Sequence, residues 1–255
     1  GAVALRVADL RAGERVRGVS FSVRRGEILG IAGLVGSGRT ETLRALFGAD
    51  PKTGGDVFIG SASIPVNIRH PHDAVRLGLG LIPEDRKKDG LLLSLGIAVN
   101  AGLSVLARES GPAGWFSPHA ESLRVTPVCD EVGVRRASLE QAGGELSGGN
   151  QQKVVLARWL LRDCDVLLVD EPTRGIDTTA KLRVHELLRD LAARGKAVVV
   201  VSSETSELFA VCDRIVVMSA GRIAAELAPD DWSEAALLRA SFSGYVSSPA
   251  SSLSA

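Results

Sequence analysis

Short apolar runs alternate with longer amphipathic stretches over most of the chain. Residues 16–23 alternate apolar and polar side chains around Val19, Phe21 and Val23, which predicts a half-buried strand. Further short apolar runs predict strands at 28–32, 57–59, 79–82, 166–169, 197–201 and 214–218. Helical spacing predicts helices at 41–47, 73–77, 151–161, 179–192 and 206–211. The alternation predicts an α/β domain whose mostly parallel sheet is covered on both faces.

Residues 85–145 interrupt this alternation. They hold helical segments broken at Gly111-Pro112, Pro118 and Pro127, with no clear strand run, and therefore predict an inserted α-helical subdomain. The basic run of residues 86–88 at its start is expected to form a solvated turn.

The two ends of the chain add to this outline. Residues 241–255 are rich in serine and poor in apolar side chains, which predicts a disordered tail. We expect a single domain over residues 1–255, with residues 1–84 and 146–240 as its core. Because the chain opens with Gly1 and its one methionine is Met218, we also expect it to be a piece of a longer polypeptide.

Composition and charge narrow the classes of function. Thirty basic and thirty acidic residues give a formal charge of zero, which argues against electrostatic binding to nucleic acid or to an anionic membrane surface. No apolar run approaches the roughly 20 residues that a membrane-spanning helix needs. Cys129, Cys164 and Cys212 are widely spaced, so we expect buried thiols in a reducing compartment rather than a metal site.

A glycine-rich segment joins the predicted strand at 28–32 to the predicted helix at 41–47. Its sequence, Gly33-Leu-Val-Gly-Ser-Gly-Arg-Thr40, has the glycine spacing of a phosphate-binding P-loop. In such a loop, backbone N–H groups and the positive end of the following helix surround phosphate oxygens, and the Thr40 hydroxyl can ligate Mg²⁺. Arg39 stands where the pattern requires lysine, so a simple strand-to-helix turn is the alternative.

An acidic pair follows the apolar run at 166–169. Asp170 ends that predicted strand, where a carboxylate can reach the magnesium shell, and Glu171 follows at a position suited to polarising an attacking water. The alternative is that these carboxylates only terminate a strand and cap a helix.

A glycine pair precedes the amphipathic helix predicted at 151–161. Residues 146–150, Leu-Ser-Gly-Gly-Asn, are called the signature segment below. They place Ser147, Gly148 and Gly149 at the positive end of that helix, which suits an anion. A serine-capped helix that needs no ligand is the alternative.

Together these motifs resemble the nucleotide-binding domain of ABC transporters. The closest resemblance is to the second, C-terminal ATP-binding domain of bacterial sugar-importer ATPases of the ribose, galactose and xylose type. It runs from about residue 5 to residue 242 and rests on Gly33-Leu-Val-Gly-Ser-Gly-Arg-Thr-Glu41, Pro83-Glu-Asp-Arg-Lys-Lys-Asp-Gly90, Leu146-Ser-Gly-Gly-Asn-Gln-Gln-Lys153, Asp170-Glu-Pro-Thr-Arg-Gly-Ile-Asp177 and Val201-Ser-Ser-Glu204. The resemblance implies a P-loop NTPase (RecA-like) core with an antiparallel β edge beside the helical subdomain.

The same resemblance implies a site for ATP and Mg²⁺. Catalytic roles would belong to Glu171 and Ser203, and Mg²⁺ ligation to Thr40, Asp170 and Glu84. ATP-binding residues would be Gly33, Leu34, Val35, Gly36, Ser37, Gly38, Arg39, Thr40, Glu41, Glu84, Ser147, Gly148, Gly149 and Asp177. Two such domains pair head to tail in this family, so that the signature segment serves the partner domain's ATP. Asp177 is then expected at the interface or, equally, as a helix cap.

Three positions depart from the pattern of active ABC domains. Arg39 replaces the P-loop lysine, Glu84 stands at the glutamine of the Q-loop, and Ser203 stands at the switch histidine. Arginine is a bulkier fork than an ammonium, serine is shorter than imidazole, and Glu84 brings negative charge toward phosphates. All three changes oppose rapid hydrolysis at this domain's own site.

The resemblance implies a role in sugar uptake at the cytoplasmic face of the cell membrane. The expected partners are an N-terminal ATP-binding domain of the same polypeptide, membrane permease subunits and, indirectly, a solute-binding protein, with no nucleic acid. The alternatives are a nucleoside importer, a non-hydrolytic nucleotide-binding interaction module, and a soluble ABC ATPase that acts on DNA or ribosomes.

Overall fold

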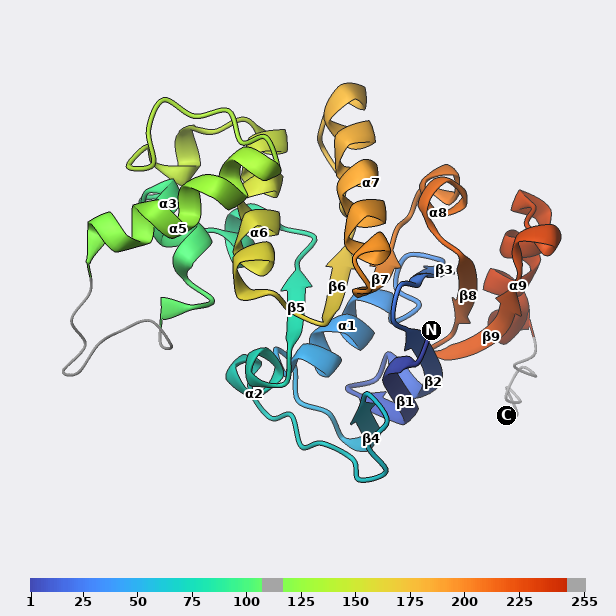
Figure 1. Ribbon diagram of the computed structural model, residues 1–255. Coiled ribbons are helices and arrows are strands. Elements are labelled where there is room, and N and C mark those ends of the chain that lie inside the picture. Colours follow the sequence, from blue (N-terminus) through green and yellow to red (C-terminus); the bar gives the residue numbers. More distant parts are fainter. Residues whose placement is uncertain (107–116, 247–255) are drawn as a thin grey trace, which may run out of the picture.

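The computed structural model describes residues 1–106 and 117–246, and these form an α/β domain with two sheets (Figure 1). Within these residues the larger sheet has six strands, and the five from β5 to β8 in its order are parallel. Its order is β5 (Leu79–Ile82), β6 (Val166–Asp170), β7 (Ala197–Val201), β3 (Ile28–Gly33), β8 (Arg214–Ser219) and β9 (Arg222–Leu227). The last strand is antiparallel and forms one edge. The loops that follow the parallel strands therefore gather at one side of the sheet.

The smaller sheet is antiparallel and holds β2 (Val16–Arg24), β1 (Val3–Ala12) and β4 (Gly54–Ile59) in that order. Helix α1 (Arg39–Phe47) contacts strands of both sheets, whereas α7 (Thr178–Ala193) and α8 (Thr205–Val211) cover the other face of the large sheet (Figure 1). Each strand and helix predicted from the apolar pattern is present, as is the predicted covering of both faces.

Two strands lie where the sequence predicted none. Strand β1 contains register shifts, and Asp9 within it has a φ of 51°, so its apolar positions do not alternate regularly. Strand β9 has no fully buried residue, and its alanines and glutamate are not typical of a strand. Periodicity fails to predict β1 because its bulges interrupt the period of two. In β9 burial does alternate, but its two alanines make the contrast between apolar and polar positions weak.

The prediction of disorder from residue 241 is wrong for residues 241–246. Helix α9 (Glu234–Val246) continues through them and packs on β8. Its anchors are Leu237, which is buried, and Ser241, whose carbonyl accepts a 2.6 Å hydrogen bond from the Ser219 hydroxyl. Tertiary packing overrides the polar composition here, and the rest of the predicted tail lies outside the described residues.

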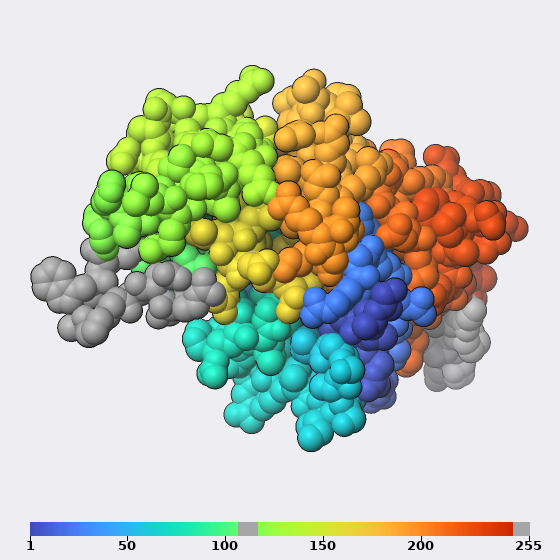
Figure 2. All heavy atoms as spheres, in the orientation of Figure 1, coloured from blue at the N-terminus to red at the C-terminus, as the bar shows by residue number. Residues whose placement is uncertain are grey.

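The helical insertion is confirmed for the described part of residues 85–145, and its later part, residues 117–145, lies at the upper left of Figure 2 in light green. It contains the π-helix η1 (Arg86–Gly90), α3 (Ile97–Gly102), α5 (Pro118–Glu131) and the 3₁₀ turn η3 (Gly143–Glu145), and it packs on α6 (Gly148–Arg162). Pro118 opens α5, as its preset φ favours. Pro127 does not break α5, because the carbonyl that loses its donor belongs to Leu123, a residue 64% exposed to solvent. Gly111-Pro112 lies outside the described residues.

Helix α6 ties the helical subdomain to the core. Trp159 on α6 donates a 2.8 Å hydrogen bond from Nε1 to the carbonyl of Leu81 in β5 and meets the Phe47 ring edge-on. The remaining short elements are α2 (Pro71–Arg76) and the 3₁₀ turn η4 (Pro229–Asp231). In the described part of the chain, no helix is long and apolar enough to cross a membrane.

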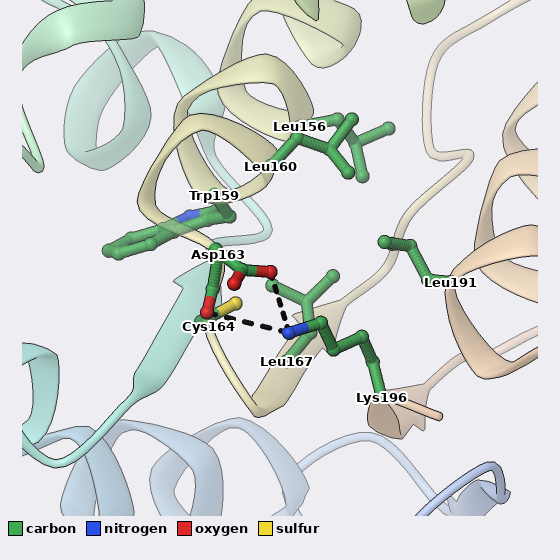
Figure 3. Close-up of a pocket in the computed structure, with 8 residues that line it drawn as sticks. All are labelled: Leu156, Trp159, Leu160, Asp163, Cys164, Leu167, Leu191 and Lys196. Atoms are coloured by element: carbon green, nitrogen blue, oxygen red, sulfur yellow. Dashed lines mark hydrogen bonds and ion pairs between the residues drawn. The ribbon is translucent and has the colours of Figure 1, made fainter. Parts of the chain in front are cut away.

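A small hollow enclosed by α6, β6 and α7 is a packing feature rather than a ligand site (Figure 3). Its volume of about 20 Å³ has room for about one water molecule. At its rim, Lys196 Nζ lies 2.7 Å from a carboxylate oxygen of Asp163. Burial raises the pKa of the adjacent Cys164 thiol to about 12, and Cys129 and Cys212 are also buried and free. The sequence prediction of buried thiols is confirmed.

Candidate functional site

The loops after β3, β5, β6 and β7 enclose an open cavity of about 460 Å³ at the carboxyl side of the large sheet. Eight residues predicted from the motifs line it: Val35, Gly36, Arg39, Thr40, Glu41, Glu84, Glu171 and Ser203. Arg15, Arg174, Gly175 and Glu204 complete the lining. Segments far apart in the sequence thus form one site, as the strand order dictates.

The P-loop backbone depends on its glycines. Gly33, Gly36 and Gly38 have φ values of 149°, 81° and 101°, which side-chain-bearing residues rarely adopt. A Cβ at Gly38 would lie 2.1 Å from the Arg15 carbonyl oxygen, whereas one at Gly36 would meet nothing within 4 Å. Gly38 therefore packs against the β1–β2 turn, and Gly36 leaves open space at the cavity. This concave backbone fits a phosphate group.

Arg39 is held by protein atoms. It is 7% exposed, and its Nη1 donates a 2.6 Å hydrogen bond to the Ser202 carbonyl just after β7. Its Nη2 lies 4.0 Å from a carboxylate oxygen of Glu171. Burial lowers the pKa of Arg39, and the nearby carboxylates of Glu171 and Asp170 oppose that shift. The guanidinium thus reaches the end of β7 rather than lying free in the P-loop.

Asp170 and Thr40 provide oxygen atoms suited to a magnesium ion. Asp170 is 2% exposed, and among the described residues its Oδ1 has no hydrogen-bond partner. Burial raises the pKa of this carboxyl group to about 6, although a hydrogen bond from Thr40 works in the opposite direction. A buried carboxylate oxygen without a partner beside a hydroxyl fits a divalent cation, whose charge would offset the cost of burial.

Glu171 and Ser203, the predicted catalytic residues, are in direct contact. The Ser203 hydroxyl donates a 3.0 Å hydrogen bond to Glu171 Oε2. The Glu171 backbone has a φ of 48° and its N–H donates to the Val201 carbonyl at 2.9 Å. A non-glycine residue in this left-handed region carries strain of about 1 to 2 kcal/mol. The fold therefore aims this carboxylate into the cavity at a cost in stability.

Other predicted cavity residues are engaged by arginines. Glu84 forms an ion pair with Arg174, and Glu41 pairs with Arg15 at 2.7 Å. The Arg174 pairing neutralises the negative charge that Glu84 brings toward the cavity, and its role as an Mg²⁺ ligand stays a prediction. Arg15 was not predicted from the sequence, because the β1–β2 turn that carries it has no motif.

The signature segment lies at the start of α6, away from this cavity. Ser147 is the exposed N-cap residue, but its hydroxyl makes no cap hydrogen bond and instead accepts one from Asn150 Nδ2 at 3.2 Å. Ser147, Gly148 and Gly149 are not among the residues that line the cavity. Their predicted contact with ATP thus calls for a second domain.

Asp177 caps helix α7. Its Oδ1 accepts a 3.0 Å hydrogen bond from the Ala180 backbone N–H, as an N-cap carboxylate does. The helix-cap alternative is confirmed, and a place for Asp177 at a domain interface stays a prediction.

Comparison with known protein families agrees with this geometry. A family model described as "ABC transporter" matches residues 16–174. The chain belongs to the ABC transporter family. More specifically, it is an ABC transporter ATP-binding domain, with the predicted ABC cassette fold of a mixed sheet, an antiparallel sheet and helices.

Curated relatives of this ABC domain are longer than the chain. It is 46% identical over 244 residues to the "Ribose import ATP-binding protein RbsA 3" of Rhizobium meliloti (strain 1021), covering 96% of the chain and 48% of the relative. It is 44% identical over 238 residues to a "Putative ribose/galactose/methyl galactoside import ATP-binding protein 1" of the same organism, covering 93% and 47%. The chain therefore spans about half the length of these relatives.

Solved ABC cassettes share the fold. The ATP-binding cassette MJ1267 aligns with a TM-score of 0.77 at 18% identity, covering 94% of the chain and 99% of the cassette. The dimeric cassette MJ0796, described in a post-hydrolysis state bound to ADP and Pi, aligns with a TM-score of 0.73 at 22% identity, covering 88% and 98%.

Proposed function

We propose that this chain is the second, C-terminal ATP-binding domain of a bacterial sugar-importer ATPase. The observation that carries the proposal is the single cavity lined by Gly36 of the P-loop, Thr40 and Glu171, with Asp170 hydrogen-bonded to Thr40 beside it. The identity of 46% to a ribose import ATP-binding protein favours a sugar of the ribose or galactose type as the transported solute.

The chain's own residues would bind and orient MgATP. The P-loop amides would surround the phosphates, and Thr40 and Asp170 would hold Mg²⁺. When bound, Mg²⁺ offsets phosphate charge. Glu171 is placed to accept a hydrogen bond from a water that enters the cavity.

Three contacts support slow hydrolysis at this domain's own site. Arg39 Nη1 donates to the Ser202 carbonyl, so this donor is not available to phosphates and the guanidinium is held at the end of β7. The Ser203 hydroxyl donates to Glu171 Oε2, so one oxygen of that carboxylate already has a hydrogen-bond partner and is less available to a water in the cavity. Glu84, which stands at the Q-loop glutamine, is paired with Arg174, so its carboxylate is less available to a metal ion or a water in the cavity. We infer that this site retains nucleotide, while turnover takes place at the partner domain's ATP.

The partner in this proposal is an N-terminal ATP-binding domain of the same polypeptide, and the relatives are about twice as long as the chain. The signature segment would contact ATP bound by that domain, in a head-to-tail pair. The pair would act with membrane permease subunits and, indirectly, a solute-binding protein, at the cytoplasmic face of the membrane.

Steady-state turnover tests the state of the chain's own site. The purified 255-residue chain should hydrolyse ATP well below the order of 10 per second, an ordinary enzyme value. A coupled assay of phosphate release measures this rate, with Glu171→Gln as the background control. Turnover at the ordinary enzyme value would show that Arg39, Glu84 and Ser203 do not impair the site.

Calorimetric titration tests the role of Thr40. Mg²⁺ should tighten ATP binding to the chain by about tenfold, or about 1.4 kcal/mol. In Thr40→Val the gain should disappear, because the hydroxyl oxygen is lost while the volume of the side chain is kept. Thr178→Val, an equal change at an exposed position on α7, is the matched control. An undiminished Mg²⁺ effect in Thr40→Val would contradict the assignment.

A further inference from the structure

The basic run after Glu84 does not form the uniformly solvated turn that the sequence predicted. Lys87 and Lys88 are exposed, and their backbone N–H groups donate to Asp85 Oδ1 at 3.0 and 3.1 Å. Arg86, by contrast, is half-buried inside the π-helix η1. Within one short basic run, one side chain is thus turned into the protein.

The guanidinium of Arg86 binds the backbone of the loop that follows β6. Its Nη1 donates a 2.9 Å hydrogen bond to the Arg174 carbonyl, and its Nη2 lies 3.5 Å from the Gly175 carbonyl oxygen. Its Nε is buried without a partner among the described residues. Burial lowers the pKa of Arg86, although arginine keeps its charge in proteins. Burying the charged guanidinium of Arg86 costs solvation free energy. This cost argues against Arg86 being an ordinary surface side chain.

The signature segment packs against the same guanidinium, beside residues 174–175. A Cβ placed on Gly148 would lie 2.5 Å from Arg86 Nη2 and 3.3 Å from the Gly175 carbonyl oxygen. The start of α6 also lies close to α7, because a Cβ on Gly149 would lie 3.1 Å from Ala180 Cβ. Arg86 therefore contacts both the signature segment and residues 174–175 at the place where the two segments meet.

The contacts of neighbouring residues fix the position of Arg86. Glu84 pairs with the side chain of Arg174, whose carbonyl accepts from Arg86. Asp89, at the other side, lies 3.5 Å from Arg44 of α1. The short segment of residues 84–90 is thus attached to the P-loop helix and to the loop after β6 at once.

We propose that Arg86 is a positioning residue that holds the signature segment at a fixed place against residues 174–175. This rests on the proposed function, in which that segment contacts ATP of the partner domain. A planar guanidinium with several donors can bind two carbonyls while its Nη2 end packs against the backbone at Gly148. A change at Arg86 therefore affects chemistry at the partner's site without touching either nucleotide.

The test uses the full-length polypeptide with Arg86→Ala, Arg86→Lys and the matched control Lys87→Ala. Steady-state kinetics should show kcat for ATP about tenfold lower in Arg86→Ala, because a signature segment that is no longer held misplaces its donors. KM should stay within about twofold, since the P-loops are intact. Arg86→Lys should recover part of kcat, because it keeps one charged donor, and Lys87→Ala should behave as wild type.

Two further measurements separate positioning from loss of folding and from failure of the proposed function. Thermal unfolding and MgATP binding to the isolated chain should be unchanged in Arg86→Ala; a loss of either together with kcat means a general structural role and overturns the proposal. Unchanged kcat in Arg86→Ala overturns the positioning role. If Ser147→Ala is inactive in the same assay, the proposed function still stands. If Ser147→Ala is fully active, the proposed function and this inference both fail.

Discussion

Removing the buried carboxylate of Glu207 should lower the free energy of unfolding by about 3 kcal/mol or more. This residue is 1% exposed and accepts three hydrogen bonds. Their donors are Thr173 Oγ1 at 2.7 Å, Ser202 Oγ at 2.6 Å and a ring nitrogen of His185 at 2.8 Å. Each buried donor that loses its acceptor costs about 1 to 3 kcal/mol. Glu207→Ala leaves all three donors without that acceptor.

Chemical denaturation of the 255-residue chain measures this effect. The matched control is Glu186→Ala, because Glu186 is an exposed glutamate that pairs with Arg183 within α7 at 2.9 Å, and such pairs contribute about 0.5 kcal/mol or less. Equal decreases in the free energy of unfolding of the two variants would show that the Glu207 network does not stabilise the fold. The network joins the segments that carry Glu171 and Ser203, so its loss should also disturb the site.

The stabilisation by Glu207 should depend on pH in a defined direction. Burial raises the pKa of Glu207, but the hydrogen bonds from His185, Ser202 and Thr173 outweigh it and bring the pKa below its ordinary value of 4.5. A depressed folded-state pKa means that the contribution is fully present above about pH 4.5 and is lost as the pH falls through the folded-state value. The difference in the free energy of unfolding between wild type and Glu207→Ala should therefore become smaller at acidic pH.

Ser147→Ala should reduce ATP turnover of the full-length polypeptide by at least about 100-fold, the scale found when a donor to a transition-state charge is removed. The Ser147 hydroxyl makes no cap hydrogen bond in α6 and the residue is exposed. Alanine at this position should therefore change the stability of this domain little. A loss of activity would then mean that the Ser147 hydroxyl contacts a ligand bound by another domain.

The matched control for that experiment is Ser122→Ala. Ser122 is a partly exposed serine of the helical subdomain, and its hydroxyl donates to the Pro118 carbonyl of its own helix. Turnover should be unchanged in the control. If Ser147→Ala retained wild-type turnover, the idea of a site shared between two domains would be wrong.

The strands and loops that build the cavity were predictable because their signals are local. The run before Gly33 and the run before Asp170 are short, apolar and followed by recognisable motifs, and the parallel sheet brings their ends together. The contact of Ser203 with Glu171 follows from the same strand order. Motif and topology together therefore located the site.

The side-chain partners within the site were not predictable. Nothing local in the sequence indicates that Arg39 reaches the Ser202 carbonyl or that Glu84 pairs with Arg174, because each pair is distant in sequence. A weak signal existed for the Glu207 network. His185 is a polar residue on the buried side of α7, beside Val184 and Leu188, and a buried polar side chain requires a partner.

The left-handed backbone at Glu171 creates a conflict between thermal stability and the proposed catalytic role of this residue. Glycine adopts that conformation without the penalty that glutamate carries. Directed selection of this domain for thermal tolerance alone would therefore reward loss of the carboxylate that faces the cavity. A variant selected in this way would keep the scaffold but lose the carboxylate that we propose to orient the attacking water.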